Sequence, residues 1–387
     1  MNWLGKLISA GIVAVALAVT PALAQTQQQR SDEAYAAFNS GDYDRAYSIA
    51  RPLADEGLLD AQTLVGYLFE IGGGVDQSFE QALKWYRRAA DQGSDYAENA
   101  IGVFYDNGSG VPQDDAEAVR WYQRAADKGN LDAQNNLGFM YETGQGVSPD
   151  FQLAVKWYRR AADGGLALAQ SNLGNMYFNG RGVEADDLEA VRWFRKSAAQ
   201  SSANGQANLA FAYETGRGVK QDYEEALRWY RLAASQGNAF AQNAIGLFYD
   251  YGHAVGEDKA EAFRWYMQGA NAGNLDAMNN VGFAYEMGRG VAQDYAEAVR
   301  WYRQSADYDS PWAQNALGLM YQNGRGVDVD LPQAFDWYMQ AALQGYAEGM
   351  NNVGYFYDLG LGVGQDSAEA VRWYRAAADT GMALARR

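Results

Sequence analysis

The chain has 387 residues, a formal net charge of −17, no cysteine and a single histidine. Without cysteine the chain forms no disulfide, thiol nucleophile or thiolate metal site. One histidine, His253, cannot build a histidine-based catalytic triad or a two-histidine metal site within one chain. The acidic surface disfavours nucleic acid and anionic lipid, and it favours neutral or basic partners.

The first 24 residues have the features of a secretory signal peptide. Lys6 precedes an apolar run from Leu7 to Val19, and Ala22-Leu23-Ala24 forms a small-residue cleavage site. The apolar run is shorter than the ~20 residues needed to cross hydrocarbon, which argues against a stable membrane anchor. We expect cleavage after Ala24, which removes Lys6 and changes the net charge to −18, and a periplasmic or secreted protein of a bacterium.

A Trp-Tyr pair, once Trp-Phe, recurs nine times at a spacing of 36 residues. The tryptophans are Trp85, Trp121, Trp157, Trp193, Trp229, Trp265, Trp301, Trp337 and Trp373. A period of this size is typical of repeat proteins, in which each unit buries its apolar face only by stacking on its neighbours. We expect nine repeats over residues 58–381, a divergent helix pair over 25–57 that caps the amino end, and a tail over 382–387.

Each repeat is predicted to form two helices, A and B. In residues 130–165, one apolar-periodic segment runs from Leu131 to Thr143, and a second runs from Asp150 to Asp163 after a glycine-containing break. Helix A carries a small residue at its centre in every repeat, which implies that a large ring approaches there; the tryptophans are the natural candidates. Helix B begins with Asp or Ser, followed three residues later by Glu or Gln in eight of nine repeats. This is the spacing of a capping box, so we interpret these acids as structural.

The motif Leu137-Gly138-x-x-Tyr141-x-x-Gly144-x-Gly146-Val147, followed by Ala154-x-x-Trp157-Tyr158-x-x-Ala161-Ala162-x-x-Gly165, resembles the Sel1-like repeat, a relative of the tetratricopeptide repeat. The resemblance implies an all-α fold, a right-handed superhelical solenoid of antiparallel helix pairs. It also implies a scaffold or adaptor role, often in bacterial envelope signalling, without a shared active site. We therefore expect no enzymatic activity, no metal and no cofactor.

Three loops depart from the repeat pattern. The glycine that follows helix B is replaced by Ser201 in one repeat and by Asp309 in another, and the second glycine of an A–B loop is replaced by Ala254. Glycine at such positions supplies a left-handed backbone conformation. We expect the loop geometry to shift at these three sites.

A second period of 72 residues lies on helix A. The residue after the central small residue is aromatic in odd repeats, and the residue seven positions before it is aromatic or leucine in even repeats. Seven residues are two helical turns, so both positions lie on one face. Asparagine three residues before the central residue and an acid four residues after it share this face. The candidate partner-binding residues of this helix A stripe are Tyr96, Asn99, Asn135, Phe139, Glu142, Phe211, Glu214, Phe240, Asn243, Asn279, Phe283, Glu286, Trp312, Asn315 and Tyr355.

Two interpretations of the stripe stay open. In the first, the aromatic rings pack between adjacent A helices, and the amides cap or bridge neighbouring turns. The acids pair with basic residues that precede the tryptophans, such as Arg120, Lys156, Arg228 and Arg300. In the second, helix A lines a concave wall, and the stripe binds an extended ligand through its rings and amides. A neutral or basic peptide segment fits best, and a polysaccharide is the main competitor.

The leading functional hypothesis is a secreted or periplasmic scaffold that mediates protein–protein interaction through its concave face and regulates an envelope signalling or assembly system. The alternative is a glycan-binding module in envelope polysaccharide or peptidoglycan metabolism. A hydrolase with two carboxylates is disfavoured, because no pair of acids stands out from the repeating pattern. Residues 381–385 resemble the start of another helix A, so we also expect self-association or partner docking at the carboxyl-terminal edge.

Overall fold

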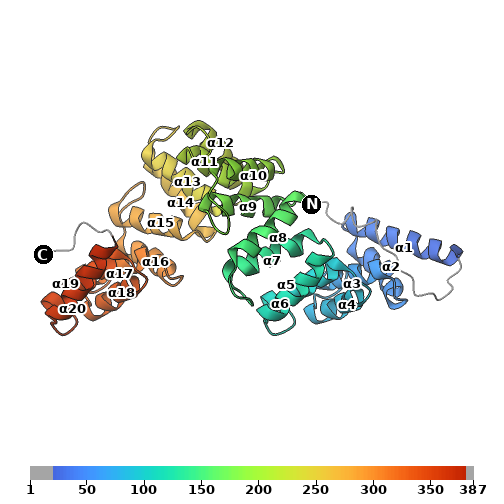
Figure 1. The fold of residues 1–387 in the computed structure, drawn as a ribbon. Helices are drawn as coiled ribbons and strands as arrows, with labels where there is room; N and C mark the ends of the chain where they lie inside the picture. Colours follow the sequence, from blue (N-terminus) through green and yellow to red (C-terminus); the bar gives the residue numbers. More distant parts are fainter. Residues whose placement is uncertain (1–20, 381–387) are drawn as a thin grey trace. The chain divides into compact units, whose positions relative to one another are not determined.

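A computed structural model describes residues 21–380, which form twenty α-helices and no β-strand (Figure 1). Most of the predicted signal peptide (1–20) and the predicted tail lie outside the described residues. The predicted all-α solenoid of consecutive helix pairs is confirmed over this range, and the handedness of its superhelix stays a prediction. Within residues 21–380, no helix has the length and apolarity required to cross a membrane.

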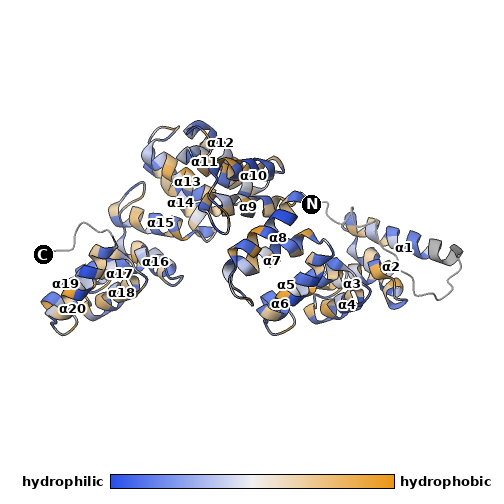
Figure 2. Ribbon diagram, in the orientation of Figure 1, coloured by the Kyte–Doolittle hydropathy of each residue, from blue (hydrophilic) through white to orange (hydrophobic). Residues whose placement is uncertain are grey.

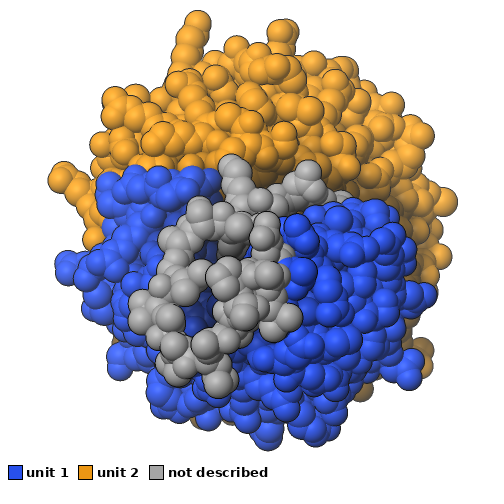
Figure 3. All heavy atoms as spheres, turned by 90° about the vertical axis from the view of Figure 1, so that its right-hand side faces the viewer, with its two compact units in different colours: residues 1–166 blue, residues 167–387 orange. Residues whose placement is uncertain are grey.

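The chain divides into two compact units, Met1–Leu166 and Ala167–Arg387 (Figure 3). The first unit contains the helices α1 (Pro21–Asn39), α2 (Tyr43–Asp55), α3 (Leu59–Ile71), α4 (Phe79–Asp91), α5 (Asp95–Asn107), α6 (Asp115–Asp127), α7 (Leu131–Thr143) and α8 (Phe151–Asp163). Helices α1 and α2 precede the repeats, and α1 begins at Pro21, ahead of the predicted cleavage position. From α3 onward, each odd-numbered helix is a helix A and the next is its helix B.

The second unit contains six further helix pairs. They are α9 (Ala167–Asn179), α10 (Asp187–Ala199), α11 (Ala203–Thr215), α12 (Tyr223–Ala234), α13 (Ala239–Tyr251), α14 (Lys259–Asn271), α15 (Leu275–Met287), α16 (Tyr295–Ala306), α17 (Pro311–Asn323), α18 (Leu331–Leu343), α19 (Ala347–Leu359) and α20 (Ser367–Asp379). Counted from α3, these pairs are repeats 4 to 9.

Local sequence signals set the helix ends. Helix α7 ends where Gly144 adopts a left-handed conformation with φ of 77°. Helix α8 begins after Asp150, whose side chain accepts hydrogen bonds from the backbone amides of Gln152 and Leu153. Every helix B from α4 to α20 has such a side-chain cap at its start. The backbone amide of the cap residue donates to the last turn of its own helix A, as Asp114 does to the Tyr105 carbonyl at 2.9 Å.

The ring that faces the small residue of helix A belongs to the residue after the tryptophan, which is tyrosine or, in repeat 4, Phe194, so the sequence-based choice of tryptophan was wrong. A Cβ atom added to Gly66, Gly138 or Gly282 would lie 2.8 Å or less from the ring of the tyrosine in the same repeat. Tyr158, for example, is fully buried against Gly138. The missing side chain therefore lets helices A and B approach within each repeat.

The tryptophans pack toward the preceding repeat instead. Trp157 of α8 joins a core with Ala118 of α6 and Leu137 of α7, and Trp301 of α16 joins a core with Ala262 of α14. Each core thus lies between two repeats rather than inside one. In Figure 2 hydrophilic and hydrophobic residues are mixed within the helices, as expected for helices that bury only one face.

The expected shift of loop geometry at the three non-glycine positions is found, but it is confined to the left-handed region. Ser201 and Asp309 both have φ of 60°, against 84–100° for the glycines at the same position of other repeats, and Ala254 has φ of 57°, against 64–72°. The packing of neighbouring repeats imposes this conformation, and the non-glycine residues are strained in it.

Candidate functional site: a cavity on the helix A face

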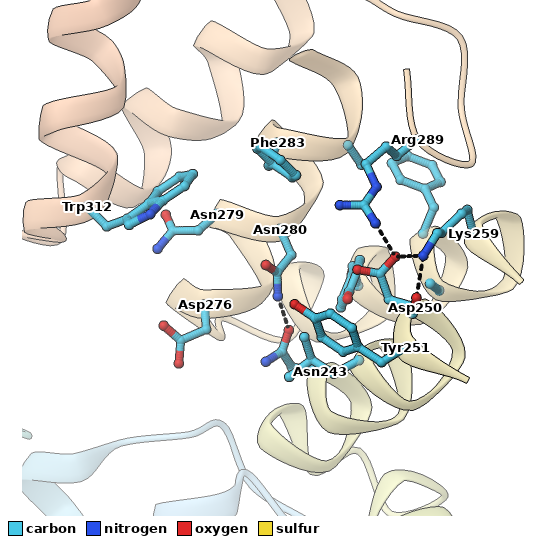
Figure 4. Close-up of a pocket in the computed structure, with 15 residues that line it drawn as sticks. Asn243, Asp250, Tyr251, Lys259, Asp276, Asn279, Asn280, Phe283, Arg289 and Trp312 are labelled. Atoms are coloured by element: carbon cyan, nitrogen blue, oxygen red, sulfur yellow. Dashed lines mark hydrogen bonds and ion pairs between the residues drawn. The ribbon is translucent and has the colours of Figure 1, made fainter. Parts of the chain in front are cut away.

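The second unit contains a cavity of about 440 Å³ formed by the A helices α13, α15 and α17 with one helix B, α14 (Figure 4). Four residues of the predicted stripe line it: Asn243, Asn279, Phe283 and Trp312. They come from three consecutive repeats, because equivalent positions on neighbouring A helices lie next to one another.

An ion-pair network closes one end of the cavity. Asp250 Oδ1 lies 3.0 Å from Lys259 Nζ and 3.2 Å from Arg289. Tyr266 hydrogen-bonds to Asp250, and burial raises the pKa of this tyrosine well above its ordinary range. The protonated phenol donates this hydrogen bond to the carboxylate. The guanidinium carbon of Arg289 also lies 5.7 Å from the centre of the Phe283 ring.

Asparagine side chains connect neighbouring A helices along the cavity floor. Asn280 donates from Nδ2 to Asn243 Oδ1 at 2.9 Å, and the equivalent bond joins Asn352 to Asn315 at 2.8 Å. Asn136 donates in the same way to Asn99 in the first unit, at 3.2 Å. Asn99, Asn243 and Asn315 of the stripe therefore accept hydrogen bonds that connect neighbouring repeats.

Asn279 differs from these bridging residues. Its Nδ2 donates to Ser310 Oγ at 3.2 Å, while its buried Oδ1 has no hydrogen-bond partner. The side chain points toward Trp312 (Figure 4). A buried amide oxygen without a donor is costly, which marks this position as one where a ligand group can add a bond.

The aromatic residues of the stripe are partly packed and partly exposed. In even repeats the ring lies edge-on to the tyrosine of the preceding helix B. Ring centres are 6.2 Å apart for Tyr96 and Tyr86, 6.1 Å for Phe240 and Tyr230, and 5.4 Å for Trp312 and Tyr302. Phe240 also contacts Phe211 at 6.0 Å and remains 41% exposed. Phe139 is 46% exposed, and Tyr355 is half-buried.

The predicted partners of the stripe acids were wrong. Glu142, Glu214 and Glu286 accept hydrogen bonds from the tyrosine hydroxyl of their own repeat at 2.8, 2.5 and 2.8 Å. Arg120, Arg228 and Arg300 instead pair with the capping-box acids Glu117, Glu225 and Glu297, three residues earlier on helix B. Helix B turns these arginines away from helix A, so they cannot reach its last turn.

The structure brings together only part of the predicted site. Tyr96, Asn99, Asn135, Phe139 and Glu142 belong to the first unit, and the other ten stripe residues belong to the second. Sequence reasoning missed the cavity residues Lys259 and Arg289. A signal for Arg289 was present, because arginine follows the first loop glycine in this repeat and also at Arg217 and Arg325.

Among residues 26–380, no group of three or more histidine and acidic side chains is arranged to hold a metal ion. Asp250, the one cavity-lining acid that is not exposed, has Tyr266, Lys259 and Arg289 as partners. The geometry is that of a binding surface built from rings, amides and one ion-pair network.

Comparison with known proteins identifies the repeat. The Sel1 repeat family model matches nine segments, residues 59–94, 95–130, 131–166, 167–202, 203–238, 239–274, 275–307, 313–346 and 347–382. A comparison with curated proteins finds no match.

Solved structures give the same result. The chain is 31% identical to c5321, described as a protective antigen present in uropathogenic Escherichia coli strains displaying an SLR fold; the match covers 93% of this chain and 88% of that one, with a TM-score of 0.54. A Sel1 repeat protein from Oxalobacter formigenes is 29% identical over 62% of this chain and 96% of its own length, with a TM-score of 0.58. Proteins of this kind are generally protein-interaction scaffolds without enzymatic activity. The chain belongs to the Sel1 repeat family.

Proposed function

We propose that this protein is a non-enzymatic scaffold that binds an extended segment of a partner protein along its helix A face, centred on the cavity of repeats 6 to 8. The observation that carries the proposal is the cavity itself, in which Trp312 and Phe283 stand beside the amides of Asn279 and Asn280. Rings anchor apolar groups of a ligand, and amides pair with its backbone.

The surface beside the cavity supports an extended ligand. Phe240, at the start of α13 and outside the cavity lining, is 41% exposed, and Tyr251 at the cavity rim is 63% exposed. These rings continue the same face, so a bound segment would contact more than one repeat. A compact ligand confined to the cavity would leave Phe240 without a contact.

The test is selection from a displayed library of random peptides, followed by calorimetric titration of the selected peptides against the full chain. Trp312→Ala should weaken binding at least about tenfold, which is about 1.4 kcal/mol. Tyr96→Ala is the matched control, because Tyr96 has the same position in repeat 2 and packs on its tyrosine in the same way. Peptides that bind wild type and Trp312→Ala equally would contradict the proposal.

A glycan ligand is the competing outcome of the same experiment. Soluble peptidoglycan fragments should leave the heat signal and the tryptophan fluorescence of the protein unchanged. Saturable binding of such fragments that is lost in Trp312→Ala, together with no selected peptide, would replace the scaffold with a glycan-binding module.

We also propose that the protein is exported and acts in an envelope signalling or assembly system. The support is the signal-peptide pattern of residues 1–24 and the acidic surface. Amino-terminal sequencing of the protein purified from its own host should begin at Gln25. If the protein is found in the cytosolic fraction and still begins at Met1, this part of the proposal is wrong.

Self-association through the last described repeat is a further proposal. Val371 of α20 is 47% exposed, whereas Val299 and Val155 at the same position of earlier repeats are 5% and 8% exposed. Sedimentation should show a concentration-dependent dimer that Val371→Lys abolishes. Val329→Lys, an already exposed loop position, is the control. A monomer at all concentrations would contradict it.

A further inference from the structure

We propose that the Trp312 end of the cavity binds the cationic side chain of a lysine or arginine of the partner segment. The inference rests on the proposed function and names the chemistry of one residue in the bound segment. Three observations support it: acidic residues on either side of Trp312, cations of the chain at the opposite end of the cavity only, and the Oδ1 atom of Asn279 that lacks a hydrogen-bond donor.

Acidic residues flank Trp312 on both neighbouring A helices. Six residues before the central glycine, repeats 7, 8 and 9 carry Asp276, Trp312 and Glu348. Equivalent positions of adjacent A helices are neighbours, as the bond from Asn352 to Asn315 shows. Asp276 lines the cavity and is exposed. Glu348 is exposed and hydrogen-bonds to the Tyr346 hydroxyl, which leaves its charge in place, and no ion pair of either acid is found within residues 26–380. An aromatic face between two unneutralised carboxylates attracts a cation.

At the opposite end of the cavity, an aromatic ring and a carboxylate are already paired with cations of the chain. Arg289 contacts the Phe283 ring and forms an ion pair with the Asp250 carboxylate, and Lys259 forms a second ion pair with Asp250. Figure 4 shows Arg289 and Lys259 at one end and Trp312 and Asp276 at the other. The chain thus supplies cations to Phe283 and Asp250, whereas no lysine or arginine of the described residues contacts Trp312 or Asp276.

Asn279 supplies an independent sign of a missing donor. It is 9% exposed, and its Oδ1 lacks a partner beside Trp312. Guanidinium and ammonium groups carry several N–H donors and no acceptor, so either can satisfy this oxygen while it faces the ring and Asp276. An apolar anchor would leave the oxygen unpaired and would take Asp276 partly out of water, both of which are unfavourable.

The experiment follows the indole N–H resonance of Trp312 in ¹⁵N-labelled full-length protein, assigned with Trp312→Phe. The probes are the peptide acetyl-Gly-Gly-Arg-Gly-Gly-amide and the same peptide with citrulline, which keeps the shape of arginine without its charge. We expect a saturable shift with the arginine peptide, at least tenfold weaker binding of the citrulline peptide, and weaker binding as salt rises.

The matched variants are the double substitution Asp276→Asn, Glu348→Gln and the control Asp132→Asn, which changes the same position of repeat 3. The double variant should weaken the arginine peptide at least tenfold, and the control should leave it unchanged; circular dichroism confirms folding of both. No shift with the arginine peptide, equal binding of the citrulline peptide, or unchanged binding by the double variant would each overturn the inference.

Failure of this inference and failure of the proposed function have different signatures. Peptides that are selected by the library, depend on Trp312 and lack lysine and arginine would overturn the cation site and leave the peptide-binding scaffold intact. A library that yields no Trp312-dependent peptide, with no shift by either pentapeptide, would overturn both.

Discussion

At the scale of single residues, the second glycine of each A–B loop is required by two constraints. It has a positive φ, as in Gly218 and Gly290. It also lies against the preceding repeat, because a Cβ atom on Gly290 would be 1.9 Å from the Lys259 carbonyl oxygen. Ala254 occupies this position in repeat 6 and carries a methyl group at φ of 57°. It is therefore a point of stored strain.

Ala254→Gly is predicted to stabilise the protein by about 0.5–1 kcal/mol, because relief of the left-handed strain outweighs the added freedom of the unfolded chain. Urea unfolding followed by circular dichroism measures the change. Gly290→Ala, which creates the same strain and a backbone clash, should destabilise the protein. A loss of stability in Ala254→Gly would show that its methyl group makes a contact worth more than the strain.

A second residue-scale feature is a pair of side chains 30 residues apart. Gln92 donates to Gln62, and Gln344 donates to Gln314, both at 2.8 Å. In repeat 2 a charged pair replaces both partners, with Lys128 Nζ 2.8 Å from Glu98. The first member is buried in repeats 1 to 8, so a polar side chain there needs its partner. Where the second member is missing, the buried oxygen is left without a donor.

Gln242 lacks its partner, because Ala272 occupies the position 30 residues later. Its buried Oε1 therefore has no hydrogen bond. Ala272→Gln is predicted to raise the free energy of unfolding by about 1 kcal/mol through the restored bond. Thermal and urea unfolding provide the measurement. In a Gln242→Met background, which copies Met278 of the next repeat, the same substitution should bring no gain. An equal gain there would assign the effect to helix propensity.

At the scale of the helix pair, tyrosine holds helices A and B together. Tyr302 lies on Gly282 and donates to Glu286 at 2.8 Å, so one side chain contacts the centre and the end of α15. Gly282→Ala would place a Cβ atom 2.3 Å from the Tyr302 ring. Alanine favours a helix by about 1 kcal/mol, but overpacking costs about 1–3 kcal/mol, so we predict net destabilisation.

Chemical denaturation of Gly282→Ala measures this balance, and Ala210→Gly is its natural counterpart. Repeat 5 already has alanine at this position against Tyr230, so its pair has adjusted to a Cβ atom. Ala210→Gly should therefore lose about 1 kcal/mol of helix propensity without relieving a clash. If Gly282→Ala is more stable than wild type, helices α15 and α16 can move apart to accommodate the added Cβ atom at little cost.

The helix pair also shows what the sequence could predict. The ends of α7 match the predicted segment, and Asp150 caps α8, because glycine, capping residues and apolar periodicity act locally. The partners of Gly138 and Glu142 were missed. Trp157 and Tyr158 are adjacent on helix B and point about 100° apart, and spacing alone does not say which one faces the same repeat. The sequence likewise could not predict that Asn279 Oδ1 lacks a hydrogen-bond donor, because this depends on the positions of side chains in neighbouring repeats.

At the scale of the whole molecule, the Trp-Tyr pair explains how repeats join. Tyrosine contacts its own helix A and the next repeat, as Tyr302 does with Trp312. Tryptophan packs back onto the preceding helix B, as Trp301 does with Ala262. Neighbouring repeats are therefore joined in both directions, and stability should follow as a sum of repeat and interface contributions.

Trp301→Ala should remove the backward contact of repeat 7. Trp301 is 4% exposed, so truncation leaves a cavity between α14 and α16 and costs about 3–5 kcal/mol. Because the loss falls on one interface, amide hydrogen exchange should accelerate in repeats 6 to 9 and stay unchanged in residues 59–130. Trp373→Ala, in the half-exposed last repeat, should cost less and affect only α18 to α20. Equal acceleration of hydrogen exchange along the whole chain would show that the repeats unfold as one cooperative body. Each tryptophan would then stabilise the whole molecule rather than one interface between two repeats.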